Sequence, residues 1–207
     1  MSKSENFWDK RAEDYDRQNK KYELSNNKAV EYSIKYFEKN NTVLDYGCAY
    51  GLITVEIAKY VKEAHGIDIS QKMIEIAKRK AQENKIENVK YSHSTIFDDI
   101  LKEDSFDVIL AYNVLHLVDD LQKVAIRINE LLKPGGFFIS ETVCLGEKKS
   151  AISFFLGFLS KIKLIPNVRK LKFSDLETLI VNSNFEIIET EDFKKDFQNY
   201  FIVAKKL

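Results

Sequence analysis

The feature that most constrains this chain is a regular alternation of short β-rich runs with segments of helical periodicity. Helical apolar spacing is found at Leu52–Val61, Ser70–Asn84, Asp119–Leu132 and Ser174–Asn184. The candidate strands are Thr42–Tyr46, Ala64–Ile69, Val89–His93, Phe106–Tyr112, Gly136–Thr142, Phe185–Asp192 and Asn199–Lys205. This alternation is typical of βαβ units, in which helices cover both faces of a parallel sheet. We therefore expect an α/β fold with a seven-stranded, mostly parallel sheet.

The length of the connection between the last two strands indicates whether they are parallel or antiparallel. Only Phe193–Gln198 joins these strands, whereas a parallel crossover needs about a dozen residues. An antiparallel hairpin is therefore predicted near the C-terminus. Two helix starts are also indicated: Ser70 can cap the helix after the second strand, and Ser174 with Glu177 matches a capping box.

Length favours a single domain, since the chain has 207 residues and domains have roughly 100–200. Within it we expect a helical cap at 1–40 and a ligand-binding core at 41–142. An insertion follows at 143–172, and a final helix and β-hairpin occupy 173–207.

Composition excludes several classes of partner and site. The 32 basic and 32 acidic side chains cancel, which argues against nucleic-acid binding. No apolar stretch suits a signal peptide or a membrane span, so we expect a cytoplasmic protein without stable membrane insertion. Cys48 and Cys144 lack the spacing of a zinc site or a disulfide framework. We predict two reduced thiols and no metal site.

Ligands of open α/β sheets bind beyond the carboxyl ends of the strands, so the first such loop is the primary candidate. It runs from Asp45 to Gly51 as DYGCAYG. Gly47 and Gly51 permit a tight turn and close approach to a ligand, and the helix from Leu52 offers unpaired N–H groups. A plain structural turn is the alternative.

The second strand ends in an acidic residue, Asp68. A carboxylate at this place can accept hydrogen bonds from both hydroxyls of a ribose. The alternative is an acid that interacts with the dipole of the following helix.

Asp45 decides between classes of nucleotide cofactor. A pyrophosphate bound at this loop would be repelled by Asp45, and a G-x-G-x-x-G motif placed over Gly47–Leu52 lacks its second and third glycines. Two carboxylates instead complement a cofactor with hydroxyl donors and positive charge, such as S-adenosylmethionine. An NAD-dependent oxidoreductase and a noncatalytic cofactor-binding or scaffold protein remain as alternatives.

Four segments carry a family resemblance: VLDYGCAYG at 43–51, GIDISQKMIEIAK at 66–78, FDVILAYNVLHLV at 106–118 and LLKPGG at 131–136. In this order they resemble the class I S-adenosylmethionine-dependent methyltransferases, in the small-molecule group that includes the ubiquinone and menaquinone methyltransferases. The resemblance implies a Rossmann-like sheet with its penultimate strand reversed. It also implies methyl transfer to a small-molecule acceptor, with S-adenosylhomocysteine as product.

The resemblance also implies roles for individual residues. It places the loop Gly47–Gly51, including Cys48 and Tyr50, beside the methionine part of the cofactor, with Asp45 ordering the loop or binding the amino group. The other implied positions are Asp68 at the ribose, Ile69 against the adenine, Ser94 and Thr95 near the adenine, and Tyr112 at the methionine part. The sequence departs from the family at Ser94, where an acid is usual, and at Ala49, where a glycine is usual.

Methyl transfer from a sulfonium is an in-line displacement, which depends mainly on alignment and on excluding water. A hydroxyl acceptor would also need a general base. His116 follows the fourth strand and titrates near neutral pH, and Glu141 lies near the end of the fifth strand. Both are candidates, and a packing or structural role is the alternative for each.

The insertion at 143–172 is unusually apolar around Phe154, Phe155 and Phe158. We expect a lid over an apolar or aromatic acceptor, to which Trp8, Tyr15 and Tyr22 could also contribute. The alternatives are a helix that completes the core, a homodimer contact, and transient membrane contact through the flanking lysines.

Overall fold

The structure is a computed structural model that describes residues 2–19, 28–147, 168–194 and 198–207. Its helices are α1 (Lys3–Asn19), α2 (Lys28–Ser33), α3 (Leu52–Ala58), α4 (Gln71–Glu83), α5 (Leu121–Leu131) and α7 (Phe173–Asn182), with the 3₁₀ turns η2 (Ile34–Tyr36) and η3 (Leu115–Leu117). Its strands are β1 (Thr42–Tyr46), β2 (Glu63–Asp68), β3 (Val89–His93), β4 (Phe106–Tyr112), β5 (Leu132–Val143), β6 (Phe185–Lys194) and β7 (Gln198–Lys206).

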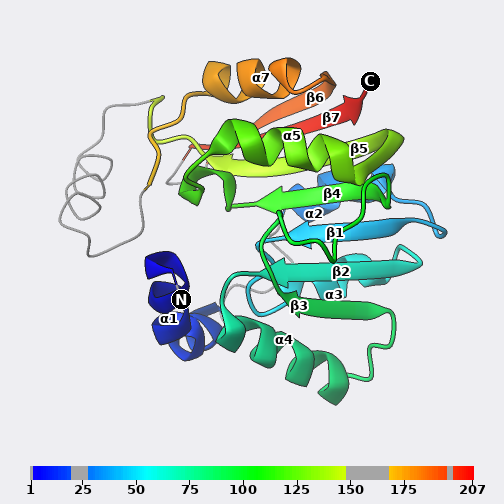
Figure 1. The fold of residues 1–207 in the computed structure, drawn as a ribbon, viewed down its shortest axis with the longest axis vertical. Coiled ribbons are helices and arrows are strands. Elements are labelled where there is room, and N and C mark those ends of the chain that lie inside the picture. The colour runs from blue at the N-terminus through cyan, green and yellow to red at the C-terminus, as the bar shows by residue number, and fades with distance from the viewer. Residues whose placement is uncertain (1, 20–27, 148–167, 195–197) are drawn as a thin grey trace.

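The strands form one seven-stranded sheet in the order β3-β2-β1-β4-β5-β7-β6. β1 to β5 pair in parallel, whereas β7 is antiparallel to both β5 and β6. The predicted α/β fold, the C-terminal hairpin and the single reversed strand, penultimate in space, are confirmed. The carboxyl ends of β1 to β4 point to the left of Figure 1, and α1 lies at that end.

The sheet is covered on both faces, as the sequence predicts. In Figure 1, α5 and α7 lie in front of the sheet, and α2 and α3 lie behind it. The front core includes Ile109, Phe138 and Ile202, and the rear core includes Leu110 and Val203. These side chains alternate along β4, β5 and β7, which is the expected pattern for strands buried on both faces.

The fifth strand begins earlier than predicted. The sequence predicted a strand from Gly136, but β5 starts at Leu132. Its register against β4 shifts, since Phe106 pairs with Leu132 and Val108 pairs with Phe137. The proline and glycines form a bulge within the strand rather than a turn before it, because a bulge tolerates a missing N–H and a positive φ.

One predicted helix cap is confirmed and the other is wrong. The Ser70 hydroxyl accepts a hydrogen bond from the Met73 N–H at 3.2 Å. At α7, however, the carboxylate of Asp175 accepts from the Lys172 N–H at 2.8 Å. The helix therefore starts one residue before Ser174, and an aspartate provides the cap interaction that we had assigned to Ser174 and Glu177.

Helix α1 lies at the carboxyl end of the sheet. Most of the insertion, 148–167, lies outside the described residues, as does Tyr22. On its near side the Gly146 N–H donates to the Leu171 carbonyl at 2.8 Å, so the two ends of the segment meet. None of the described helices is both long and apolar enough to cross a membrane. The cytoplasmic location stays a prediction.

Candidate cofactor and acceptor site

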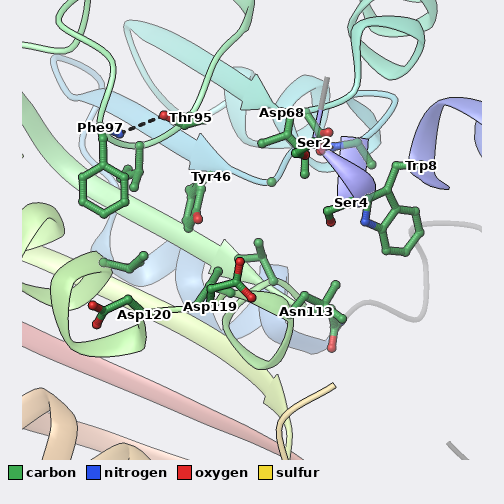
Figure 2. A pocket seen from close by; sticks show the side chains of 18 of the residues that line it. Ser2, Ser4, Trp8, Tyr46, Asp68, Thr95, Phe97, Asn113, Asp119 and Asp120 are labelled. Atoms are coloured by element: carbon green, nitrogen blue, oxygen red, sulfur yellow. Dashed lines mark hydrogen bonds between the residues drawn. The ribbon is translucent and has the colours of Figure 1, made fainter. Parts of the chain in front are cut away.

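A cavity of about 500 Å³ opens at the carboxyl ends of β1, β2 and β4, beside α1 (Figure 2). Its wall combines loops that follow four strands with the first turns of α1 and α5. The lining residues are Ser2, Ser4, Trp8, Tyr46, Gly47, Ala49, Asp68, Ile69, Met73, Thr95, Ile96, Phe97, Tyr112, Asn113, Val114, Leu117, Val118, Asp119, Asp120, Lys123 and Val124. The predicted ligand end of the sheet therefore contains a real cavity.

The loop after β1 follows a left-handed path past this cavity. Gly47 has φ +77° and Ala49 has φ +48°. A Cβ atom added at Gly47 would lie 2.8 Å from Cγ2 of Val114. Gly47 is therefore needed both for its dihedral angles and for close approach to the β4 loop. Ala49 adopts the left-handed conformation that usually favours glycine.

Asp68 lies in the cavity wall at the end of β2 and supports the neighbouring loops. Its Oδ2 accepts from the Ala49 N–H at 3.0 Å, and its Oδ1 accepts from the Ser70 N–H at 2.8 Å. Burial raises the pKa of the carboxyl group, and these two hydrogen bonds oppose the rise. Each oxygen retains acceptor capacity, so Asp68 can support both loops and still accept from a ligand hydroxyl.

Asp45 is a buried residue of β1 that does not line the cavity. Its Oδ2 accepts from the Thr54 hydroxyl of α3 at 2.6 Å. Burial raises the pKa of Asp45 to about 6, although the Thr54 hydrogen bond lowers it. The position matches the loop-ordering role better than direct contact with an amino group, since the carboxylate holds α3 beneath the loop.

Three other residues of the loop face away from the cavity. Cys48 is a buried free thiol, and burial raises its pKa. Tyr50 packs beside Met73, and the Lys80 ammonium lies 4.2 Å from its ring centroid. The Gly51 carbonyl accepts from the Tyr91 hydroxyl at 3.2 Å. Cys144 is likewise a buried free thiol.

Of the residues predicted to lie near the adenine and the methionine part of the cofactor, some line the cavity and others do not. Ile69 and Thr95 line the cavity, whereas Ser94 is buried behind it, with its hydroxyl donating to the Thr95 carbonyl at 2.9 Å. Tyr112 lines the cavity, but its hydroxyl hydrogen-bonds with Ser33 of the α2 layer. The Tyr112 hydroxyl is therefore directed to the α2 layer.

His116 lies in η3, next to the cavity wall but not in it. Its Nδ1 is buried and has no hydrogen-bond partner among the described residues. Burial lowers the pKa of the imidazole to about 4, so His116 is neutral at pH 7. Its carbonyl accepts from the Arg169 N–H at 2.8 Å.

Glu141 is buried near the end of β5 and also lies outside the cavity lining. Its Oε1 accepts from the Asn199 amide at 2.8 Å, and its Oε2 accepts from the Asn113 amide at 3.4 Å. The cavity is reached by Asn113 instead, a residue that our sequence reasoning missed. The sequence did contain a signal for Asn113: it is an asparagine directly after a strand, and asparagine is one of the residues that most often adopts left-handed backbone.

Ser2 and the first turns of α1 complete the wall, and of these residues Trp8 was a predicted contributor whereas Ser2 and Ser4 were not. Ser2, Ser4 and Trp8 line the cavity. The helix is held by Asp9, whose Oδ1 accepts from the Ser70 hydroxyl at 2.6 Å and from the Lys72 N–H at 3.2 Å. Across the described part of the chain, no three His, Cys, Asp or Glu side chains gather in a group that could hold a metal ion.

Comparison with known proteins identifies relatives of this chain. A family model described as a methyltransferase domain matches residues 37–199. The methyltransferase YcgJ of Bacillus subtilis is 28% identical over 137 residues, which cover 66% of this chain and 54% of YcgJ. The ubiquinone biosynthesis O-methyltransferase of Coxiella burnetii is 33% identical over 117 residues, covering 53% and 49% of the two chains. The chain thus spans about half the length of these curated relatives.

Solved structures show the same fold. The YcgJ crystal structure superposes with a TM-score of 0.72 at 19% identity, covering 86% of this chain and 97% of that one. Geranyl diphosphate C-methyltransferase from Streptomyces coelicolor, solved with S-adenosylhomocysteine, gives a TM-score of 0.73 at 14% identity and covers 86% and 77%. The Rossmann-like architecture expected from the sequence is confirmed.

Proposed function

Because this chain belongs to the methyltransferase domain family, we propose that it transfers a methyl group from S-adenosylmethionine to a small-molecule acceptor. The observation that carries the proposal is the meeting of Asp68, Ile69 and the left-handed Gly47–Ala49 loop in one cavity. A carboxylate, an apolar side chain and a closely approaching backbone suit the ribose, the adenine and the amino-acid part of this cofactor.

The residues present fit that group. Asp68 would accept from the ribose hydroxyls, and Ile69, Thr95 and Phe97 would enclose the adenine. Gly47 would lie along the amino-acid part. Asp45 supports this loop from behind the cavity, through Thr54 and α3.

When bound, S-adenosylmethionine supplies a methyl group on a positive sulfonium; its C–S electron pair stays on sulfur while an acceptor lone pair forms the new bond. The protein's own contribution is alignment and exclusion of water, which can supply roughly 7–11 kcal/mol of barrier reduction in favourable cases. Trp8, Val114 and Leu117 give the wall an apolar surface for both tasks. This surface supports an apolar or aromatic acceptor.

A hydroxyl acceptor must also lose one proton to a base or to solvent. His116 is neutral at pH 7, because burial lowers its pKa to about 4, but the same shift makes it a weak proton acceptor, and it lies outside the cavity lining. A pH–rate profile of His116→Ala, measured against wild type with the same acceptor, tests the role. An identical profile shape in both proteins would leave His116 a packing role.

Calorimetric titration with S-adenosylmethionine, S-adenosylhomocysteine and NAD tests the cofactor. We expect micromolar binding of both adenosyl ligands and none of NAD. The Asp68→Ala variant should bind S-adenosylhomocysteine on the order of 100-fold more weakly, because a charged hydrogen-bonding group is worth about 1.5–3 kcal/mol per bond. Glu87→Ala, at an exposed position before β3, should bind normally.

Methyl transfer itself is measured with S-adenosylmethionine labelled in its methyl group. A panel of phenols, amines and apolar carbon acceptors is incubated with the protein, and the label is sought in the products. Tight NAD binding without adenosyl-ligand binding would establish the oxidoreductase alternative. Adenosyl binding with no transfer to any acceptor would favour the noncatalytic alternative.

A further inference from the structure

Asn113 combines an unusual backbone conformation with a place in the cavity wall. It directly follows β4, has φ +55°, and is exposed. Asparagine is one of the few residues other than glycine that tolerates this left-handed region. The conformation turns the chain out of β4 while keeping Asn113 in the cavity wall.

Glu141 holds Asn113 in this position, and Asn199 in turn contacts Glu141. Its main-chain N–H donates to the Glu141 carbonyl at 2.7 Å, and its amide donates to Glu141 Oε2 at 3.4 Å. The other carboxylate oxygen accepts from the Asn199 amide at 2.8 Å. The three residues therefore form a line of hydrogen bonds from β7 through β5 to the end of β4.

The sheet order gives Asn113 a defined place relative to the cofactor site. Asp68 ends β2 and the glycine loop follows β1, whereas Asn113 follows the next strand, β4, which pairs with β5. In Figure 2, Asn113 lies toward Trp8 and Ser4, and Thr95 and Phe97 lie at the opposite end of the cavity. Asn113 is thus at the end of the cavity away from the predicted adenine position.

We propose that Asn113 contacts the reacting end of the cofactor, where the methyl group leaves, and that Glu141 and Asn199 are positioning residues for its amide. This inference rests on the proposed function. With one amide N–H committed to Glu141, the side chain keeps one N–H and its carbonyl oxygen. A carbonyl oxygen at this place favours the positive charge of the sulfonium and its methyl group.

Two cofactor analogues test this contact without knowledge of the acceptor. Sinefungin carries a protonated amine where S-adenosylmethionine carries its methyl sulfonium, and S-adenosylhomocysteine is neutral there. We expect Asn113→Gly to weaken sinefungin binding about tenfold and S-adenosylhomocysteine binding less than twofold, in line with a hydrogen bond to a charged group. Glycine accepts φ +55°, so the variant keeps the backbone path.

Thr95→Ala is the matched control. Thr95 lines the opposite end of the same cavity, so its loss should weaken both analogues by the same factor. The ratio of the two affinities is therefore the decisive readout, since general damage to the fold or the cavity lowers both affinities together.

The positioning role of Glu141 is tested by two substitutions. Glu141→Ala removes both acceptors and should lower the affinity ratio as Asn113→Gly does. Glu141→Gln should restore it: the new amide can accept from Asn113 and, with the Asn199 amide turned over, donate to Asn199 Oδ1 in place of the present Nδ2 contact. Circular dichroism melting of each variant confirms that it is folded.

The outcomes separate the two proposals. If wild type binds neither analogue, the proposed function fails. If wild type binds both and the ratio is unchanged in Asn113→Gly, or if Glu141→Gln and Glu141→Ala behave alike, the inference is wrong while the function stands.

Discussion

Ala49 occupies a backbone conformation that glycine would adopt with less strain. Its φ of +48° is left-handed, which costs an L-residue with a Cβ atom roughly 1–2 kcal/mol. We expect Ala49→Gly to raise the free energy of unfolding by about 1 kcal/mol, with S-adenosylhomocysteine binding retained, because the N–H to Asp68 is unchanged. Urea denaturation measures the change. Ala58→Gly, in α3, should destabilise instead, and a loss of stability at both positions would contradict the strain argument.

Asp45 provides a pH test of the buried support beneath the loop. Burial raises the pKa of Asp45 from 3.8 to about 6, so its contribution to stability is present below pH 4 and is lost as the pH rises through 6. Asp45→Asn removes this titration and can still accept from Thr54. The stability gain of the variant should therefore grow between pH 4 and 6, by up to about 3 kcal/mol, and then level off.

The stability of wild type is compared with that of Asp45→Asn because a second buried group, His116, also changes the wild-type stability with pH. The lowered pKa of His116, about 4, acts in the opposite direction, since that residue's contribution is lost as the pH falls from 6.5 to 4. The two effects partly cancel in wild type, and subtraction isolates Asp45. A stability difference that does not vary between pH 4 and 7 would refute the assignment.

At residue scale, the sequence predicted which loops form the site better than which side chains face it. Asp68, Ile69 and Thr95 line the cavity, but their neighbours Cys48, Tyr50 and Ser94 are turned away from it. For Cys48 and Tyr50 the reason is the left-handed turn at Gly47 and Ala49, which breaks the alternation from which the facing of side chains is ordinarily inferred. Asn113 was missed for the same reason, since its positive φ reorients the chain after β4.

At the scale of elements, one arginine connects the far end of the insertion to the cavity wall. The Arg169 Nε donates to the Val118 carbonyl at 2.7 Å, and a terminal guanidinium nitrogen donates to the Asp119 carbonyl. The Arg169 main chain adds a third hydrogen bond, to His116. Val118 and Asp119 both line the cavity, so this clamp fixes part of the site.

We expect Arg169→Lys to loosen this clamp, because a single ammonium cannot reproduce the fork of guanidinium donors. The variant should lose about 2 kcal/mol of stability and show faster amide hydrogen exchange at Leu117–Asp119, with the sheet strands unchanged. Lys170→Ala, at an exposed neighbour, is the control. Equal exchange in wild type and Arg169→Lys would show that the loop is held by other contacts.

Elements with strong periodicity were predictable, and those that depend on tertiary context were not. The stripe of Met73, Ile74, Ala77 and Ala81 is buried in α4 as expected. The bulge in β5 could not be foreseen, because Pro134 and Gly135 are normally turn signals. There, pairing with β4 extends the strand across them, so tertiary pairing overrides the local preference.

At the scale of the whole molecule, the first helix and the last strand both contribute to the site formed by the loops after β1, β2 and β4. β7 lies between β5 and β6 in the sheet and carries the buried residues Phe201 and Ile202. It also supplies Asn199 behind the cavity. At the other end, α1 covers the cavity through Ser4 and Trp8. The two ends differ in how they are held, since β7 is paired on both sides and α1 is docked mainly on α4.

This difference predicts that the molecule does not unfold in a single step without ligand. Trp8 is the one tryptophan in the sequence, so intrinsic tryptophan fluorescence reports on α1, whereas far-ultraviolet circular dichroism reports on the whole fold. In urea we expect the fluorescence midpoint to precede the circular dichroism midpoint, because a peripheral helix opens at lower free energy than a central strand. Asp9→Ala should lower the fluorescence midpoint alone, since it removes the contacts to Ser70 and Lys72.

Saturation with S-adenosylhomocysteine should bring the two transitions together. A ligand at 100 times its dissociation constant stabilises the binding-competent state by about 2.7 kcal/mol, and that state requires α1 in place if Ser4 and Trp8 contact the ligand. Lys10→Ala, on an exposed position of α1, should behave as wild type throughout. Coincident midpoints without ligand would mean that α1 belongs to the cooperative core. Midpoints that stay separate at saturation would mean that the cofactor binds without α1, so the helix would then be needed only on the acceptor side.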